Sequence, residues 1–444
     1  MLSSLESLNH FLWSGPVLIL LGAVHLLFTL RLKFPQKLTF QAIRLSITSD
    51  DSAPKDEKNL SGFAALATTL AATLGTGNIV GVSTAIALGG PGALFWCWIT
   101  GILGMSTAYA ECYLSCLFRR KRADGTAIGG PMYVLEDGLH RKGLALLYAL
   151  CLLFAALGVG CTTQSSAISD AIGACWNISP HITGILAAVF TGFVIIGGIK
   201  SIGNFCVRIV PVLGFFYIGC CLLLLWMTRN SLPAALTLIF QRAFHPGAAL
   251  GGFVGSTLQT ALRFGVARGL FTNEAGIGTA SIAAAASASS PRRQGLISMT
   301  AVFWDTVVMC ALTGIVIVAN MIQNPASIAG YSSGGLMMAA FSMLPFYGEE
   351  LLSVALVAFA LATLVGWCYF GEKGCEYLFG EKGIPIYHFC YIIMAYLGAV
   401  LPMGLVWGVT DLVNGIMVFP NVFALFLLRK RITIRASGKQ TRAK

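Results

Sequence analysis

The residues best suited to binding chemistry form the stretch Leu74–Gly81, with the sequence LGTGNIVG. Two glycines flank Thr76 and Asn78 follows them, which is poor material for a helix interior. The stretch nevertheless lies inside the apolar segment 62–90, where an uninterrupted membrane helix would be expected. Backbone N–H and C=O groups freed at this depth are costly unless they find partners, so the break must face protein or a polar cavity. The stretch is therefore a candidate binding site.

A second interruption of the same kind divides the apolar segment 248–286 at Gly269–Gly278, with the sequence GLFTNEAGIG. Broken helices present half-helix N–H groups that suit a carboxylate, and their freed carbonyls suit Na⁺, a hard cation that prefers oxygen ligands. Close helix packing explains most membrane glycines, so either break alone would be weak evidence. Two breaks at matching positions favour a site.

The composition assigns the chain to the membrane. Of its 444 residues, 56% are hydrophobic and 11% are charged, compared with about a quarter charged in a typical soluble protein. Apolar runs of about 20 residues recur along the whole length, which predicts an all-α polytopic membrane protein with the lipid bilayer as its partner. The formal net charge of +11 comes from Lys and Arg at the ends of apolar segments, so we expect no nucleic-acid binding. Most of the 13 cysteines lie within apolar runs and none forms a zinc-type CxxC pair, which indicates packing rather than metal binding.

We expect about eleven transmembrane helices, at about 12–30, 62–90, 93–118, 144–172, 181–199, 205–228, 248–286, 295–321, 350–371, 385–402 and 404–428. The segment 231–246 is too short and polar to span and should lie at the surface, and the loop 322–348 should hold a short interfacial helix. Basic residues follow the first apolar segment and do not precede it, so we interpret that segment as a retained helix and not as a cleaved signal peptide.

Basic residues concentrate in alternate loops, which predicts a multi-pass protein of the cell membrane with its N-terminus outside and its C-terminus inside. Beyond the first helix, ten spans remain, and the two interrupted ones each begin a set of five. Five helices cannot return the chain to its starting side, so the two sets enter the membrane in opposite senses, as in an inverted repeat. The expected organisation is an N-terminal helix and cytoplasmic connection (1–60), a first repeat (61–230), a second repeat (231–430) and a basic cytoplasmic tail (431–444).

Several long motifs carry a family resemblance. They are GTGNI at Gly75–Ile79, AIALGGPGA at Ala85–Ala93, GGPMY at Gly129–Tyr133, GGIK at Gly197–Lys200, GVARGLF at Gly265–Phe271 with NEAG at Asn273–Gly276, and Gly366-Trp367 with Tyr369. Over about residues 60–430 the chain resembles the sodium:alanine symporter family, the alanine or glycine:cation symporters. The resemblance implies a leucine-transporter-type fold of five plus five helices, and Na⁺-coupled uptake of alanine or glycine.

The resemblance also implies a set of substrate-binding residues. The amides of Thr76 and Gly77 would hold the substrate carboxylate, and Gln164 would contact the amino group. Phe271 and Thr272 would line the second break, and Trp367 would wall the pocket and keep it small. Gly75, Asn78 and Gly276 would be structural residues of the breaks. Asn78 could bind the ion or cap the second half of the first broken helix, and we favour the cap.

Sodium, the co-transported ion, is the one metal that the resemblance implies, and no cofactor is expected. Its ligands would be the carbonyls of Ala71 and Leu74 and the hydroxyl of Thr363. A hydroxyl residue often precedes this threonine in the family pattern, whereas this chain has Ala362, which leaves one oxygen fewer. On the residues alone, the Thr363 hydroxyl could equally bond back to its own helix, and Gln164 could form an interhelical bond.

Other functions remain as alternatives to sodium symport. A proton-coupled carrier of the same fold is the closest alternative, although the span 205–228 has no interior lysine to replace sodium. An ion channel would need a continuous ring of polar groups. An enzyme is not expected, because no HExxH, GxSxG or Walker motif is present. Ionisable residues within the spans are functional suspects by default, and they are Glu111, Arg263, Arg268, Glu274, Asp305 and Asp411.

Overall fold

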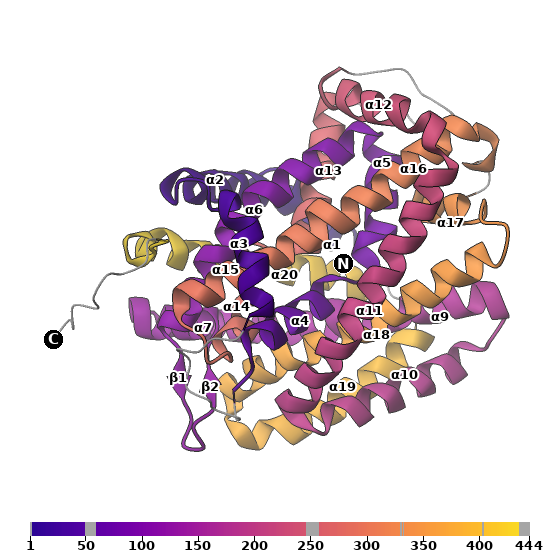
Figure 1. The fold of residues 1–444 in the computed structure, drawn as a ribbon. Coiled ribbons are helices and arrows are strands. Elements are labelled where there is room, and N and C mark those ends of the chain that lie inside the picture. The colour runs from indigo at the N-terminus through magenta and orange to yellow at the C-terminus, as the bar shows by residue number, and fades with distance from the viewer. Residues whose placement is uncertain are drawn as a thin grey trace.

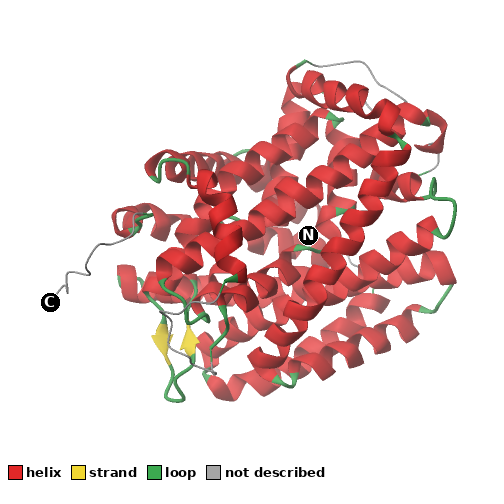
Figure 2. Cartoon of the chain, in the orientation of Figure 1, coloured by secondary structure: helices red, strands yellow, loops and turns green. Residues whose placement is uncertain are grey.

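The computed structural model describes residues 2–48, 59–245, 257–328, 331, 333–401 and 404–434. These residues are almost entirely helical (Figures 1 and 2), with one small antiparallel hairpin of β1 (Arg120–Lys121) and β2 (Ala127–Ile128) among them. The acidic part of the first connection, the start of the segment 248–286 and most of the basic tail lie outside the described residues.

The α-helices follow one another along the chain with short connections. Those of the first half are α1 (Leu2–Ser14), α2 (Pro16–Arg31), α3 (Thr39–Ile47), α4 (Gly62–Thr73), α5 (Val80–Gly89), α6 (Gly92–Leu117), α7 (Pro131–Tyr133), α8 (Lys142–Ala155), α9 (Thr163–Trp176), α10 (Pro180–Ile195) and α11 (Gly198–Met227). Those of the second half are α12 (Leu232–Phe244), α13 (Leu258–Asn273), α14 (Ala280–Ala285), α15 (Pro291–Val302), α16 (Ala311–Gln323), α17 (Leu336–Phe341), α18 (Gly348–Phe379), α19 (Ile384–Val400) and α20 (Gly404–Leu428).

Three π-helical segments and several short 3-10 helices complete the described chain. The π segments are η3 (Val134–Gly138), η4 (Ala156–Thr162), which joins α8 to α9, and η6 (Phe303–Cys310), which joins α15 to α16. The 3-10 helices are η1 (Pro35–Leu38), η2 (Thr76–Asn78), η5 (Arg229–Ser231), η7 (Pro325–Ile328), η8 (Ser333–Gly335), η9 (Glu381–Gly383) and η10 (Arg429–Arg431).

The helices confirm the all-α polytopic membrane class. Within the described ranges, 8 helices are long and apolar enough to cross a membrane. The pair Gly62–Thr73 and Thr76–Gly89, bent by 61°, adds a ninth if it counts as one broken span. The helix α10 is apolar but shorter. The count of eleven therefore stays a prediction.

Several helix boundaries differ from those that the hydropathy pattern predicts. Helix begins at Leu2, well before the expected start of the first span, and α1 meets α2 at Gly15 and Pro16. The second break comes later than its motif suggests, because α13 continues through Phe271 and Thr272 and ends where Glu274 adopts a left-handed φ of 54°. The segment expected at the surface is the helix α12, and the loop 322–348 contains the short helix α17.

The two broken helices cross one another at the centre of the fold. The half-helix α4 contacts α14, and α5 contacts α13, so the two broken helices run in opposite directions. Backbone hydrogen bonds join their ends, from Leu60 N–H to Ala286 O at 3.0 Å and from Ala288 N–H to Leu60 O at 3.2 Å. This is the arrangement expected of an inverted repeat, although the repeat itself stays a prediction.

Two groups of helices lie around this pair, and α13 of the second broken helix belongs to one of them. One group consists of α6, α13 and α15. The helix α6 contacts both α13 and α15, and it also contacts α5 and α14. The other consists of α8, α9, α10, α18 and α19. The half-helix α4 lies between the groups, since it contacts both α15 and α18.

Glycine allows α18 and α4 to approach closely at this junction. A Cβ atom on Gly366 would lie 2.8 Å from the backbone N of Ala72, and this backbone atom cannot move away easily. The substitution Gly366→Ala should therefore lower stability by about 1–3 kcal/mol through overpacking. Thermal unfolding in detergent, followed by loss of the monodisperse size-exclusion peak, would show a lower midpoint.

Gly219→Ala provides the matched control, because this helical glycine has nothing within 4 Å of the added Cβ. It should leave stability unchanged or raise it by about 0.5–1 kcal/mol, the usual gain from Gly to Ala in a helix. Equal midpoints for the two variants would contradict the close approach at Gly366.

Candidate functional site

Among the described residues, the N–H groups of Thr76 and Gly77 in the first break have no hydrogen-bond acceptor. The half-helix α4 starts at its N-cap Ser61, whose hydroxyl accepts from Ala64 N–H at 3.0 Å, and it ends at Thr73. Gly75 N–H then donates to Thr73 O at 2.9 Å and to Asn78 Oδ1 at 3.2 Å. The N–H groups of Thr76 and Gly77, the first two residues of η2, donate to no other residue in the described part of the chain. These two amides are free to bind an anionic group.

Thr363 of α18 lies directly against this break. Its hydroxyl is buried and donates to the carbonyl of Ala71 at 3.0 Å. A Cβ on Gly75 would lie 2.8 Å from Thr363 Oγ1 and 3.4 Å from Gln164 Oε1, so glycine is what lets both polar groups reach the backbone. Leu74, also buried, is the C-cap of α4. The fold thus brings the three residues expected to bind a cation next to Gln164.

Gln164 is positioned by the π segment η4. Its Nε2 donates to the carbonyl of Val159 at 3.2 Å, inside that segment, and its Oε1 accepts from Thr76 Oγ1 at 3.4 Å. π-Helical turns are frequent at functional sites because they shift side chains and release carbonyls. The amide therefore faces the first break and not the lipid.

The last turn of α13 forms the opposite side of the break. A Cβ on Gly77 would lie 3.0 Å from Thr272 Cγ2 and 4.0 Å from Phe271 Cδ1. The Thr272 hydroxyl donates to the carbonyls of Arg268 and Gly269, each at 3.1 Å, which leaves its methyl group toward Gly77. Both residues are helical and precede the interruption of the second broken helix.

Trp367 lies one turn after Thr363 and is fully buried. Its side chain packs on Gly160 of η4, where a Cβ would overlap the indole, and against Phe370 in a T-shaped arrangement with ring centroids 5.7 Å apart. An interfacial location for this tryptophan is thereby excluded. It joins α18 to the π segment that positions Gln164.

Asp305 connects the two breaks, a role that the sequence did not reveal. Its carboxylate is fully buried in η6 and accepts from Asn78 Nδ2 at 2.6 Å and from Thr306 Oγ1 at 2.7 Å. Asn273, the last residue of α13, donates through Nδ2 to Thr306 Oγ1 at 3.2 Å. The signal in the sequence was an acidic residue in the middle of an apolar span, which marks a functional suspect without naming its partners.

The side chain of Asn78 caps the 3-10 turn η2 inside the break, whereas the sequence predicted a cap on the second half of the first broken helix. Its Oδ1 accepts from Gly75 N–H, inside the break, and its Nδ2 donates to Asp305. The helix α5 begins at Val80 with Ile79 as its N-cap and no side-chain cap. The amide thus satisfies the turn before the helix and ties it to η6.

Side chains from other helices hold part of the backbone of the second break. Gly276 has a φ of 99°, which favours glycine. Its N–H donates to Glu111 Oε1 at 2.8 Å, and its carbonyl accepts from Asn421 Nδ2 at 2.8 Å. Asn421 also donates to Glu111 at 2.6 Å, and Tyr148 donates to the carbonyl of Ile277 at 2.9 Å. The helices α6, α8 and α20 therefore fix this break.

Other ionisable residues within the spans also have local roles. Glu274 accepts from the Thr279 hydroxyl within the second break. Arg268 lies with its guanidinium 5.7 Å from the centroid of the Phe271 ring, and Arg263 lies 5.5 Å from that of Phe264. In the part of the chain that the structure describes, no group of three or more His, Cys, Asp or Glu side chains could hold a metal ion.

Comparisons with known proteins agree with this architecture. An uncharacterized transporter of Haemophilus influenzae is 43% identical over 433 residues, covering 97% of this chain and 94% of that protein. The sodium/alanine symporter AgcS of Methanococcus maripaludis is 41% identical over 432 residues, covering 96% of this chain and 94% of that protein. The crystal structure of MhsT in complex with L-phenylalanine superposes with a TM-score of 0.61 at 15% identity, covering 84% of this chain and 90% of that one. This last likeness concerns the fold alone.

The family comparison spans nearly the full sequence. The profile of the sodium:alanine symporter family matches residues 1–441, which include both breaks, Gln164 and Thr363. Two relatives at more than 40% identity cover 97% and 96% of this chain. This chain belongs to the sodium:alanine symporter family.

Proposed function

We propose that this protein imports alanine or glycine together with Na⁺ by alternating access, with the first break as the binding site. The observation that carries the proposal is the pair of unpartnered N–H groups of Thr76 and Gly77 beside the Ala71–Thr363 contact. Two amides at the start of a helical turn suit the substrate carboxylate. Family membership and the sodium/alanine symporter AgcS among its relatives support sodium and alanine as the cargo.

The cation would bind beside the carboxylate. Thr363 Oγ1 and the Ala71 carbonyl are 3.0 Å apart, so one ion could accept oxygen lone pairs from both after the hydroxyl hydrogen turns away. The Leu74 carbonyl, where α4 ends, would be a third ligand. Ala362 adds no oxygen at this point. A Na⁺ ion at this position would also offset the negative charge of the substrate carboxylate.

The remaining contacts suit a small neutral amino acid. Gln164 Oε1, which faces Thr76, would accept from the substrate ammonium group. Phe271 and Thr272 would close the pocket on the α13 side, and Trp367 would limit its depth. The protein would lie in the cell membrane with its N-terminus outside and the basic ends of its helices inside.

The main test of this function is uptake by the purified protein in lipid vesicles. Labelled alanine should accumulate when an inward Na⁺ gradient is imposed, and replacement of Na⁺ by choline at fixed pH should reduce the initial rate at least tenfold. Labelled glycine should compete for uptake. An unchanged rate in choline would refute sodium coupling.

Proton coupling is the second candidate, and Asp305 is the observation that favours it. A buried carboxylate between the two breaks could carry a proton as well as accept hydrogen bonds. In the same vesicles, an inward pH gradient in choline would then drive uptake. Under sodium coupling that gradient should produce none.

Thr363→Val tests the cation ligands, because it keeps the shape of the side chain and removes its oxygen. The half-saturating Na⁺ concentration should rise about tenfold, since one contact with a charged group contributes roughly 1.5 kcal/mol. Thr363→Ser, which keeps the oxygen, should stay near wild type. If the hydroxyl only bonds to Ala71, the valine variant would lose thermal stability while its sodium dependence stayed that of the wild type.

Gly77→Ala tests the carboxylate contact. Neither Gly77 nor Gly81 has a positive φ, so alanine fits the backbone at both positions. At Gly77, however, the new methyl group would press on Thr272 at 3.0 Å and separate the break from α13, which should weaken alanine binding at least tenfold. Titration calorimetry in saturating Na⁺ measures this change.

The matched control for this substitution is Gly81→Ala, one turn further along the same helix. Its Cβ would meet only Arg268 Cδ at 3.9 Å, an ordinary contact, so alanine affinity should be unchanged. Equal affinity for alanine in the two variants would remove Gly77 from the proposed site.

A further inference from the structure

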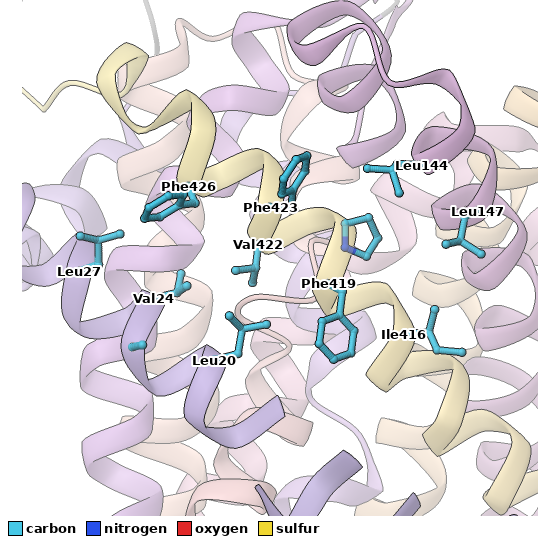
Figure 3. A pocket seen from close by; sticks show the side chains of 12 residues that line it. Leu20, Val24, Leu27, Leu144, Leu147, Ile416, Phe419, Val422, Phe423 and Phe426 are labelled. Carbon is cyan, nitrogen blue, oxygen red and sulfur yellow. The ribbon is translucent and has the colours of Figure 1, made fainter. Parts of the chain in front are cut away.

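An apolar groove lies away from the two breaks, between α2, α8 and α20 (Figure 3). It has a volume of about 770 Å³, and all twelve residues that line it are apolar. Leu27, Leu144 and Phe426 lie toward one end of it, and Leu20 and Ile416 toward the other. The groove therefore runs along the helices, and its lining has the apolar chemistry that suits a hydrocarbon chain.

The sequence explains why the surface is hollowed at this point. Pro420 lies inside α20 and lines the groove. A proline within a helix cannot donate to the carbonyl four residues earlier, here that of Ile416, and it bends the helix there. Ala23 of α2, which also lines the groove, has a side chain too small to fill the space.

Cations gather at the end marked by Leu27 and Phe426. Arg31 ends α2 four residues after Leu27, and Arg429 follows Phe426 by three residues. Arg31 Nε donates to the carbonyl of Arg429 at 2.9 Å, which holds the ends of α2 and α20 together. Lys430 is exposed beside them.

The part of the chain that the structure describes supplies no ion-pair partner for these charges. Among the described residues, no carboxylate forms an ion pair with Arg31, Arg429 or Lys430. The nearby cation Arg120, in contrast, pairs with Glu136 at 3.0 Å and with Asp137 at 2.5 Å. The end of the groove is therefore a concentration of uncompensated positive charge.

We propose that the groove binds an anionic phospholipid, with one acyl chain between α2, α8 and α20 and the phosphate at Arg31, Arg429 and Lys430. Within a bilayer an apolar groove alone would accept the chain of any lipid, because lipid tails are as apolar as the groove. The cations supply the selectivity, since basic residues at the membrane surface attract anionic headgroups. The bound lipid joins α2 to α8 and α20.

Native mass spectrometry of the purified full chain tests this proposal, with added phosphatidylglycerol or phosphatidylcholine of identical acyl chains as probes. Wild type should retain phosphatidylglycerol at least tenfold better. Arg31→Gln combined with Arg429→Gln should abolish that preference. The control pair Lys200→Gln and Arg208→Gln, which removes two exposed basic residues at the start of α11, should keep it.

A groove-filling variant separates the contribution of the acyl chain to lipid binding from that of the headgroup. Ala23→Phe leaves every cation in place and occupies the groove, so phosphatidylglycerol retention should again fall about tenfold. Three outcomes would overturn the proposal. They are equal retention of the two lipids by wild type, an equal loss in the control pair, and full retention by Ala23→Phe.

Discussion

The need to pair backbone N–H and C=O groups within a membrane is the constraint on which the rest of this structure depends. Both broken helices release such groups at the centre of the fold, and side chains satisfy part of them in each break. Gly276 and Ile277 of the second break bond to side chains from α6, α8 and α20. In the first break, the amides of Thr76 and Gly77 have no hydrogen-bond acceptor among the described residues. Such an imbalance is tolerable where a ligand supplies the missing acceptor.

Buried carboxylates are tolerated here because they accept hydrogen bonds from buried donors at the two breaks. Glu111 accepts from Gly276 N–H and from Asn421, and Asp305 accepts from Asn78 and Thr306. In a low-dielectric interior such hydrogen bonds are strong, and the cost of leaving any member unpaired is correspondingly high. The chain Asn78–Asp305–Thr306–Asn273 thereby makes one connected polar core out of two breaks that lie about 200 residues apart in sequence.

Much of this arrangement could be predicted from residue types and spacing. Glycine and asparagine inside an apolar run located the first break closely, because both residues disfavour a helix interior whatever surrounds the helix. The second break was placed too early, since Phe271 and Thr272 are compatible with helix and the stop is a left-handed residue, Glu274. The hydrogen bond between Asn78 and Asp305 could not be predicted, because no local sequence pattern encodes which distant side chain pairs with a given polar group.

The contacts of the first break also fall on different parts of the fold. Asn78 ties it to η6, next to α6 and α13, whereas Thr363 and Gln164 reach it from α18 and α9. The first link is a short hydrogen bond of 2.6 Å to a carboxylate, and the link to Gln164 is a long one of 3.4 Å between neutral groups. If the two helix groups move relative to each other, the hydrogen bond between Thr76 and Gln164 should break before the one between Asn78 and Asp305. A ligand bound to the two amides and to Thr363 would replace the hydrogen bond between Thr76 and Gln164 with stronger contacts. Its binding energy would therefore act on the position of the two helix groups relative to each other.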